Sequence, residues 1–146
     1  MGLFPRSLYK IYTKAKIMAY KNIKDALGAT SWGESYGYYF TIDYDGEELQ
    51  GSLDYTKGVL DNPDLVQIKK IITKLKAQDE KAHKLIQKAY PDEDATELFL
   101  SDLILYGDGS FSLGYGAGES PAGQLYLYVR FNSDFTMDEE LIHEIY

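Results

Sequence analysis

The chain of 146 residues carries 23 acidic side chains against 15 basic ones, has a net charge of −8 and contains no cysteine. A chain of this length buries about two thirds of its unfolded surface in one domain without staples, and the lack of cysteine excludes a disulfide, a thiolate nucleophile and a cysteine-based zinc site. The apolar stretches fall short of the ~18 residues of a membrane span, so we expect one domain over residues 1–146, soluble and cytoplasmic, with no transmembrane segment.

The first 27 residues differ in charge from the rest of the chain. They hold six basic side chains and one acid, a net charge of +5, which leaves −13 for residues 28–146. Apolar residues recur there every three or four positions from Leu8 to Ala26, between a capping Ser7 and Gly28. This pattern predicts a basic amphipathic N-terminal helix over residues 1–27. We favour a helix that packs on its own domain; a helix that docks on a membrane surface or an acidic partner is the alternative.

Two alternating runs follow, on either side of Asp45-Gly46. Residues 36–44 and 49–55 alternate apolar or aromatic side chains with polar ones. An Asp-Gly pair supplies the positive φ angles of a tight primed turn, so these runs predict a β-hairpin.

A long helix is predicted over residues 62–90. Asn62 is the expected N-cap, Pro63 suits the first helical position, and Tyr90-Pro91 ends the helix. Asp79 falls within its apolar stripe, where we expect helix curvature or a snorkelling contact to keep the carboxylate out of the core. We expect His83 and His143 to be solvated surface residues.

Three further strands are predicted at residues 98–106, 110–115 and 124–132, with a glycine-rich connection before the last one and a short helix over residues 138–146. The fold class is therefore α+β: a mainly antiparallel five-stranded sheet, in the element order α-ββ-α-βββ-α, packed against helices.

The glycine-rich segment 114–123 does not fit a nucleotide-binding loop, because a strand follows it and it contains no lysine. Ser120 lacks the glycine two residues later that a nucleophile elbow requires. Residues 124–131 partly match the aromatic strand of RNA-recognition motifs, but an acidic body repels phosphate. We therefore expect no catalytic, metal-binding or cofactor-binding residues, no cofactor and no nucleic-acid partner.

Two groups of residues are candidates for binding a partner protein. The first lies on the polar face of the predicted sheet, which should be less buried than the opposite face, where Leu125, Leu127 and Phe131 lie. The second is a cluster of acids after the long helix, suited to attract a basic partner. The candidates are Tyr39, Tyr126, Tyr128 and Arg130 on the sheet, and Asp92, Glu93, Asp94 and Glu97 in the cluster.

In its small size, acidity, abundant tyrosine and antiparallel strands, the chain from about Tyr36 onward resembles the bacterial immunity proteins that neutralise toxins. That resemblance implies a tight, stoichiometric and non-catalytic complex with a basic toxin domain. Two alternatives remain open. One is a hydrolase with an unrecognised carboxylate site, and the other is a structural or regulatory domain that docks through its basic N-terminal helix.

Overall fold

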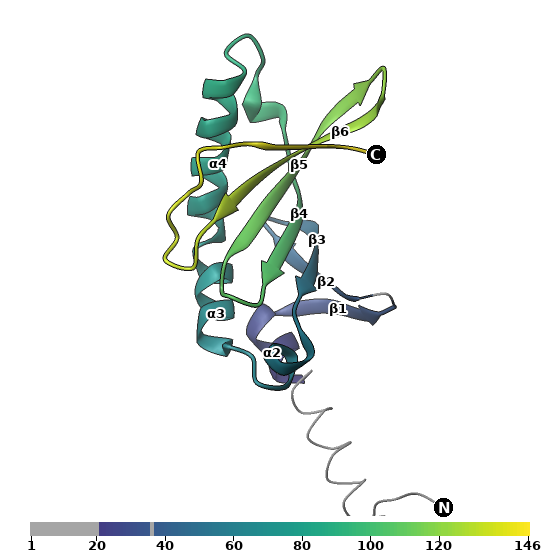
Figure 1. The fold of residues 1–146 in the computed structure, drawn as a ribbon, viewed down its shortest axis with the longest axis vertical. Coiled ribbons are helices and arrows are strands. Elements are labelled where there is room, and N and C mark those ends of the chain that lie inside the picture. The colour runs from purple at the N-terminus through teal and green to yellow at the C-terminus, as the bar shows by residue number, and fades with distance from the viewer. Residues whose placement is uncertain (1–20, 36) are drawn as a thin grey trace, which may run out of the picture.

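The computed structural model describes residues 21–35 and 37–146 of the chain (Figure 1). Its elements, in chain order, are the helical residues 21–27, β1 (Ala29–Glu34), β2 (Tyr38–Tyr44), β3 (Glu47–Asp54), α2 (Lys57–Asp61), α3 (Leu65–Thr73), α4 (Leu75–Ala89), the 3-10 turn η1 (Ala95–Glu97), β4 (Leu100–Tyr106), β5 (Phe111–Ser120), β6 (Gly123–Phe131) and β7 (Ile142–Ile145).

The strands form one seven-stranded sheet in which they follow chain order, from β1 at one edge to β7 at the other. All neighbours are antiparallel except β3 and β4, which run parallel. The fold is α+β, but the expected five-stranded, mainly antiparallel sheet is wrong on strand number and on this pair. The helices between β3 and β4 return the chain to the end of the sheet at which β3 began, and such a crossover makes a parallel pair.

The two strands that the sequence did not predict lie at the edges of the sheet. β1 has only one large apolar side chain, Trp32, and most of its residues are exposed, so no alternating pattern marks it. β7 replaces the helix expected over residues 138–146. Its backbone pairs with β6 from Tyr128↔Ile142 to Leu125↔Ile145, and this pairing outweighs the local helix signal of the acids before it.

The predicted hairpin is confirmed. β2 and β3 pair in register from Tyr38↔Leu53 to Tyr44↔Glu47, and the turn residues Asp45 and Gly46 have φ angles of 53° and 82°.

The predicted long helix is two helices that follow one another along one side of the sheet (Figure 1). α3 ends at Thr73, Lys74 adopts a non-helical geometry, and α4 begins at Leu75. The N-cap is Asp64, whose carboxylate accepts from the Gln67 N–H at 3.1 Å, and not the expected Asn62, which closes α2 instead.

The hydrophobic core lies between α3 and α4 and one face of the sheet. Ile68, Ile71, Leu75, Ala82 and Ile86 form the buried helical stripe. Alternate residues of the inner strands complete the core, including Phe40, Leu103, Leu113, Val129 and Phe131. Ile23, Ala26 and Leu27 from the end of the first helix belong to the same buried cluster. The earlier part of the predicted N-terminal helix lies outside the described residues.

The glycine-rich segment, expected to be a flexible connection, is mostly strand. β5 continues to Ser120 and β6 begins at Gly123, so only a tight turn joins them. Within this segment β5 and β6 lose register between Gly116 and Glu119. A bulge of this kind bends the pair.

Gly51 tests the packing of the core face. A Cβ atom at Gly51 would lie 2.3 Å from Cζ of Phe40 and 3.0 Å from the main-chain oxygen of Leu103. We therefore expect Gly51→Ala to lower the free energy of unfolding by about 1–3 kcal/mol, the usual effect of overpacking a core. Urea unfolding followed by far-UV circular dichroism measures this change.

The control is Gly33→Ala in β1, where nothing lies within 4 Å of the added atom. This substitution should be neutral or slightly stabilising, because alanine restricts the unfolded chain. Equal destabilisation by the two substitutions would contradict the packing of Phe40 across Gly51.

Candidate partner-binding groove

An open groove of about 1500 Å³ runs over the sheet. Its aromatic lining consists of Trp32, Tyr39, Phe40, Tyr44, Phe99, Tyr126, Tyr128 and Tyr146. Its carboxylates are those of Asp45, Glu47, Glu48, Asp79 and Asp102. Among the described residues that line it there is no lysine or arginine. The groove is therefore both aromatic and electronegative.

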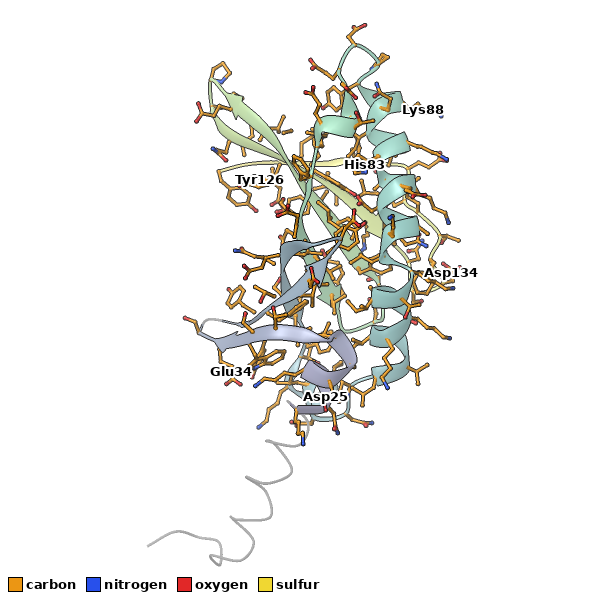
Figure 2. All side chains as sticks on the ribbon, turned by 180° about the vertical axis from the view of Figure 1, so that it is seen from behind. Asp25, Glu34, His83, Lys88, Tyr126 and Asp134 are labelled. Atoms are coloured by element: carbon orange, nitrogen blue, oxygen red, sulfur yellow. The ribbon has the colours of Figure 1, made fainter. Side chains whose placement is uncertain are left out.

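The pleat of the sheet places the three candidate tyrosines on one face, as predicted. Tyr39 and Arg130 belong to one row of paired residues that crosses the sheet through Ser52, Ile104 and Ser112, so their side chains lie on the same face. Tyr126 and Tyr128 lie four and two residues before Arg130 on the same strand, so they share that face as well. Figure 2 shows Tyr126 on the side of the sheet away from α4. The predicted difference between the two faces holds for these residues, because Tyr39 is 50 % exposed and Tyr128 8 %, against 2 % for Leu127 and 0 % for Phe131. Tyr128 itself is nevertheless buried.

Two glycines of β5 explain why Tyr128 is covered. Gly114 lies opposite Tyr128 and Gly116 lies opposite Tyr126. A Cβ atom at Gly114 would lie 2.7 Å from Cε1 of Tyr128, and one at Gly116 would lie 3.8 Å from Cε1 of Tyr126. The Tyr128 ring therefore lies across β5 in the space that a side chain at Gly114 would fill, while the Tyr126 ring only touches the space beside Gly116.

The C-terminal strand adds a third tyrosine to this group. Gln124 exchanges two backbone hydrogen bonds of 2.9 Å with Tyr146. The rings of Tyr126 and Tyr146 meet edge to face with centroids 5.4 Å apart. The Tyr146 hydroxyl donates to Glu144. Burial, a hydrogen bond with Tyr146 and nearby carboxylates raise the pKa of Tyr128 above its ordinary value, so its hydroxyl keeps its proton.

Asp102 lies beside the tyrosines in the middle of β4. It is half-buried, and it pairs with Gly114 on one side and with Gln50 on the other. Burial raises the pKa of its carboxyl to about 6, against the opposing effect of a hydrogen bond from the Leu103 N–H. In the part of the chain that the structure describes, no basic side chain forms an ion pair with it.

Asp79 of α4 fixes one end of the groove. The Tyr44 hydroxyl donates to its Oδ2 at 2.7 Å, and the hydroxyl of the fully buried Tyr115 donates to its Oδ1. The carboxylate is 15 % exposed. The expectation that Asp79 turns out of the core is therefore wrong. Burial and the bonds to Asp79 raise the pKa of Tyr44 and of Tyr115, which keeps both hydroxyls as donors.

His83 joins the same cluster and is not the solvated histidine that we expected. Its Nδ1 lies 2.9 Å from the main-chain oxygen of Asp79 and 3.1 Å from the Asp79 carboxylate. Its Nε2 lies 2.8 Å from the main-chain oxygen of Leu98. Main-chain oxygens only accept, so a neutral imidazole donates to one of the two, and the tautomer with the proton on Nε2 ties the segment before β4 to α4. The other histidine, His143 in β7, forms a 2.5 Å hydrogen bond with the Tyr90 hydroxyl.

The remaining candidates lie outside the groove lining. The Arg130 guanidinium packs 4.8 Å from the centre of the Tyr106 ring, and its Nη2 donates to Ser110. The acids Asp92, Glu93, Asp94 and Glu97 are exposed in the connection that leaves α4. Within it, hydrogen bonds from Thr96 lower the pKa of the Asp94 carboxyl. The structure thus brings three of the eight candidates together in the groove and separates them from the other five.

The groove roles of four residues were missed by sequence reasoning. Asp102 could have been noticed in the sequence, because aspartate is uncommon in the middle of a strand. Tyr146 was assigned to a helix. The roles of Asp79 and His83 depend on contacts with β2, β5 and Leu98 that are distant in sequence.

The chain matches no family model, and no curated protein and no solved structure matches it significantly. Among the described residues, no helix has the length and apolar character to span a membrane. Nor does this part of the chain hold a group of three or more histidine, aspartate and glutamate side chains placed to bind a metal ion.

The Asp79 cluster should contribute to stability. Tyr115→Phe removes one donor from a largely buried carboxylate, and hydrogen bonds to charged groups contribute about 1.5–3 kcal/mol. We expect a decrease of this size in the free energy of unfolding, measured from the urea midpoint. The matched control is Tyr106→Phe, which removes a hydroxyl bonded to neutral Ser112 at 3.1 Å and should have a smaller effect. A larger loss from the control would contradict the importance of Asp79.

Asp102 should make the protein less stable at neutral pH. Its folded-state pKa of about 6 lies above the ordinary aspartate value. The proton-linked stabilisation is therefore complete below about pH 4 and is lost as the pH rises through 6. We expect Asp102→Asn to stabilise the fold at pH 7 by about 1–2 kcal/mol, a value reduced for the remaining solvent contact of the carboxylate.

Thermal unfolding of both proteins between pH 4 and pH 8 measures this difference. Asp54→Asn in β3 removes an exposed carboxylate from the same face of the sheet and is the control, which should change the free energy of unfolding by less than about 0.5 kcal/mol. If Asp102→Asn behaves like that control, the carboxylate is not desolvated.

Proposed function

We propose that this chain is a non-catalytic protein-binding module that holds a basic partner in the groove, and that the partner is a bacterial toxin domain neutralised by an immunity protein. The observation that carries the proposal is the lining of the groove, which offers aromatic rings and five carboxylates without a lysine or arginine among the described residues.

The chemistry of this lining suits a cationic protein segment. Tyrosine and tryptophan give large contact areas at a low cost in conformational entropy, and they are enriched at the centres of interfaces. Phe99 supports the same interpretation, because it is 78 % exposed at the wall of the groove. Together with Tyr39, which is 50 % exposed in the same groove, it adds to an exposed aromatic surface of the kind that a partner covers.

The charge of the molecule supports a basic partner as well. Residues 28–146 have a net charge of −13, which the +5 of residues 1–27 reduces to −8 for the whole chain. A field of this sign accelerates the approach of a basic protein over about a Debye length. The acids of the connection after α4 lie outside the groove lining and are exposed, so in this proposal they steer association without contacting the bound segment.

The internal geometry of the groove favours binding over catalysis. The pair of groups most suited to proton transfer, Asp79 and His83, is engaged with two tyrosine hydroxyls and two main-chain oxygens. A general base must reach the proton that it abstracts, and here each imidazole nitrogen lies within 2.9 Å of a main-chain oxygen, which leaves no room for a substrate proton beside it.

Two charge-neutralising variants should separate the roles of groove and acidic connection. Asp45→Asn, Glu47→Gln and Glu48→Gln together should speed dissociation of the partner and weaken binding at least about tenfold, because these carboxylates would contact it. Asp92→Asn, Glu93→Gln, Asp94→Asn and Glu97→Gln together should slow association and reduce its salt dependence, with dissociation unchanged.

We expect a toxin gene immediately upstream of the gene for this chain. The measurement is surface plasmon resonance over a range of NaCl concentrations, with the product of that gene as the partner. Co-expression of that product with this chain should relieve its growth arrest, and arrest that persists would contradict the immunity role. If the chain instead turned over a small substrate, and one carboxylate substitution abolished that activity in a folded protein, the chain would be an enzyme.

A further inference from the structure

Asp102 lies in a row of cross-strand neighbours that is open on one side and aromatic on the other. Gln50, on β3, is exposed. Gly114, on β5, has no side chain, and the Tyr128 ring fills the space above it. A Cβ atom at Gly114 would lie 3.1 Å from Cβ of Asp102 and 2.7 Å from Cε1 of Tyr128. The carboxylate and the ring therefore border the same glycine.

Among the described residues, no lysine or arginine pairs with Asp102. Acids that are taken out of water are rarely left without a partner. In this part of the chain, Lys76 lies 3.9 Å from Asp45 and His83 lies 3.1 Å from Asp79, and neither contact includes Asp102. The nearby charged group on β7 is Glu144, which has the same sign. A cation supplied from outside would restore the missing partner.

Resting on the basic partner proposed above, we propose that Asp102 and the partly exposed ring of Tyr126, which line the same groove, take a single arginine side chain of that partner. The buried Tyr128 ring covers Gly114 and forms the wall beside the carboxylate. A guanidinium is planar, so it can donate to both oxygens of a carboxylate and also stack against an aromatic ring. The compact ammonium of lysine can donate to the carboxylate, but it has no planar face to stack against the ring.

The chain holds an arginine against a tyrosine ring elsewhere within its own fold. The Arg130 guanidinium lies 4.8 Å from the centre of the Tyr106 ring, and its Nη2 donates to the Ser110 hydroxyl. A tyrosine ring and an oxygen acceptor thus hold an internal arginine on the same sheet. At Asp102 the tyrosines and the carboxylate are present, and the arginine comes from the partner.

The test uses three acetylated and amidated peptides, Gly-Gly-X-Gly-Gly, in which X is arginine, lysine or citrulline. Citrulline has nearly the shape of arginine and no charge. Each is titrated into the full chain at pH 7.5 and followed by 1H–15N correlation spectra. We expect the arginine peptide to shift the amides of Asp102, Gly114 and Tyr128 in a saturable way, the lysine peptide to bind at least about fivefold more weakly, and the citrulline peptide to cause no shift.

Two variants locate the binding. Asp102→Asn should abolish the saturable shifts, and loss of folding is not the cause, because this substitution is expected to stabilise the protein. Asp54→Asn removes the same charge from the same face and should bind as wild type does. Equal binding of arginine and citrulline, or full binding by Asp102→Asn, would overturn the arginine pocket.

The outcomes also separate this inference from the proposed function. If the arginine peptide still binds to Asp102→Asn but is lost on neutralising Asp45, Glu47 and Glu48, the groove takes a basic partner and the pocket is wrong. If neither cationic peptide binds and the toxin is still neutralised, the pocket is again wrong. If no cationic peptide binds and no toxin is neutralised, both proposals fail.

Discussion

The carboxylate of Asp79 joins three parts of the chain that are distant in sequence. It accepts one hydrogen bond from the hydroxyl of Tyr44, at the end of the β2–β3 hairpin, and another from the hydroxyl of Tyr115 in β5. Its own helix also holds His83, which reaches the main chain at Leu98. Because β3 and β4 begin to pair only at Gln50 and Asp102, the segments before those residues have no ladder between them. Asp79 and His83 supply that connection, and so fix the two walls between which the groove opens.

The floor of the groove depends on a different device, the glycines of β5. A side chain at Gly114 would displace the Tyr128 ring, whereas glycine lets that ring lie across the strand. This arrangement leaves the Asp102 carboxylate partly desolvated without a cation, at a cost in stability at neutral pH. Carboxylates with perturbed pKa values in a concave surface are candidates for function. Asp102, the residue proposed to meet the partner, thus lowers the stability of the fold.

Features that depend on near neighbours in the sequence could be predicted. The hairpin follows from Asp45-Gly46, and the shared face of Tyr39 and Tyr128 follows from the two-residue period of a strand. Features that depend on distant partners could not. β7 forms because β6 has an open edge, although its own residues also suit a helix, and β1 has too few apolar residues to be marked as a strand. The burial of Asp79 was missed for the same reason, because its donors lie on β2 and β5.

The most direct test of this account is hydrogen exchange of Asp79→Ala under native conditions. The account predicts faster exchange at both walls of the groove together, in residues 44–48 and 98–101, while the amides of Leu103 and Leu113 in the buried strands remain protected as in wild type. Their protection shows that the fold is intact. Faster exchange at one wall only, or at neither, would contradict the claim that this carboxylate holds the groove open.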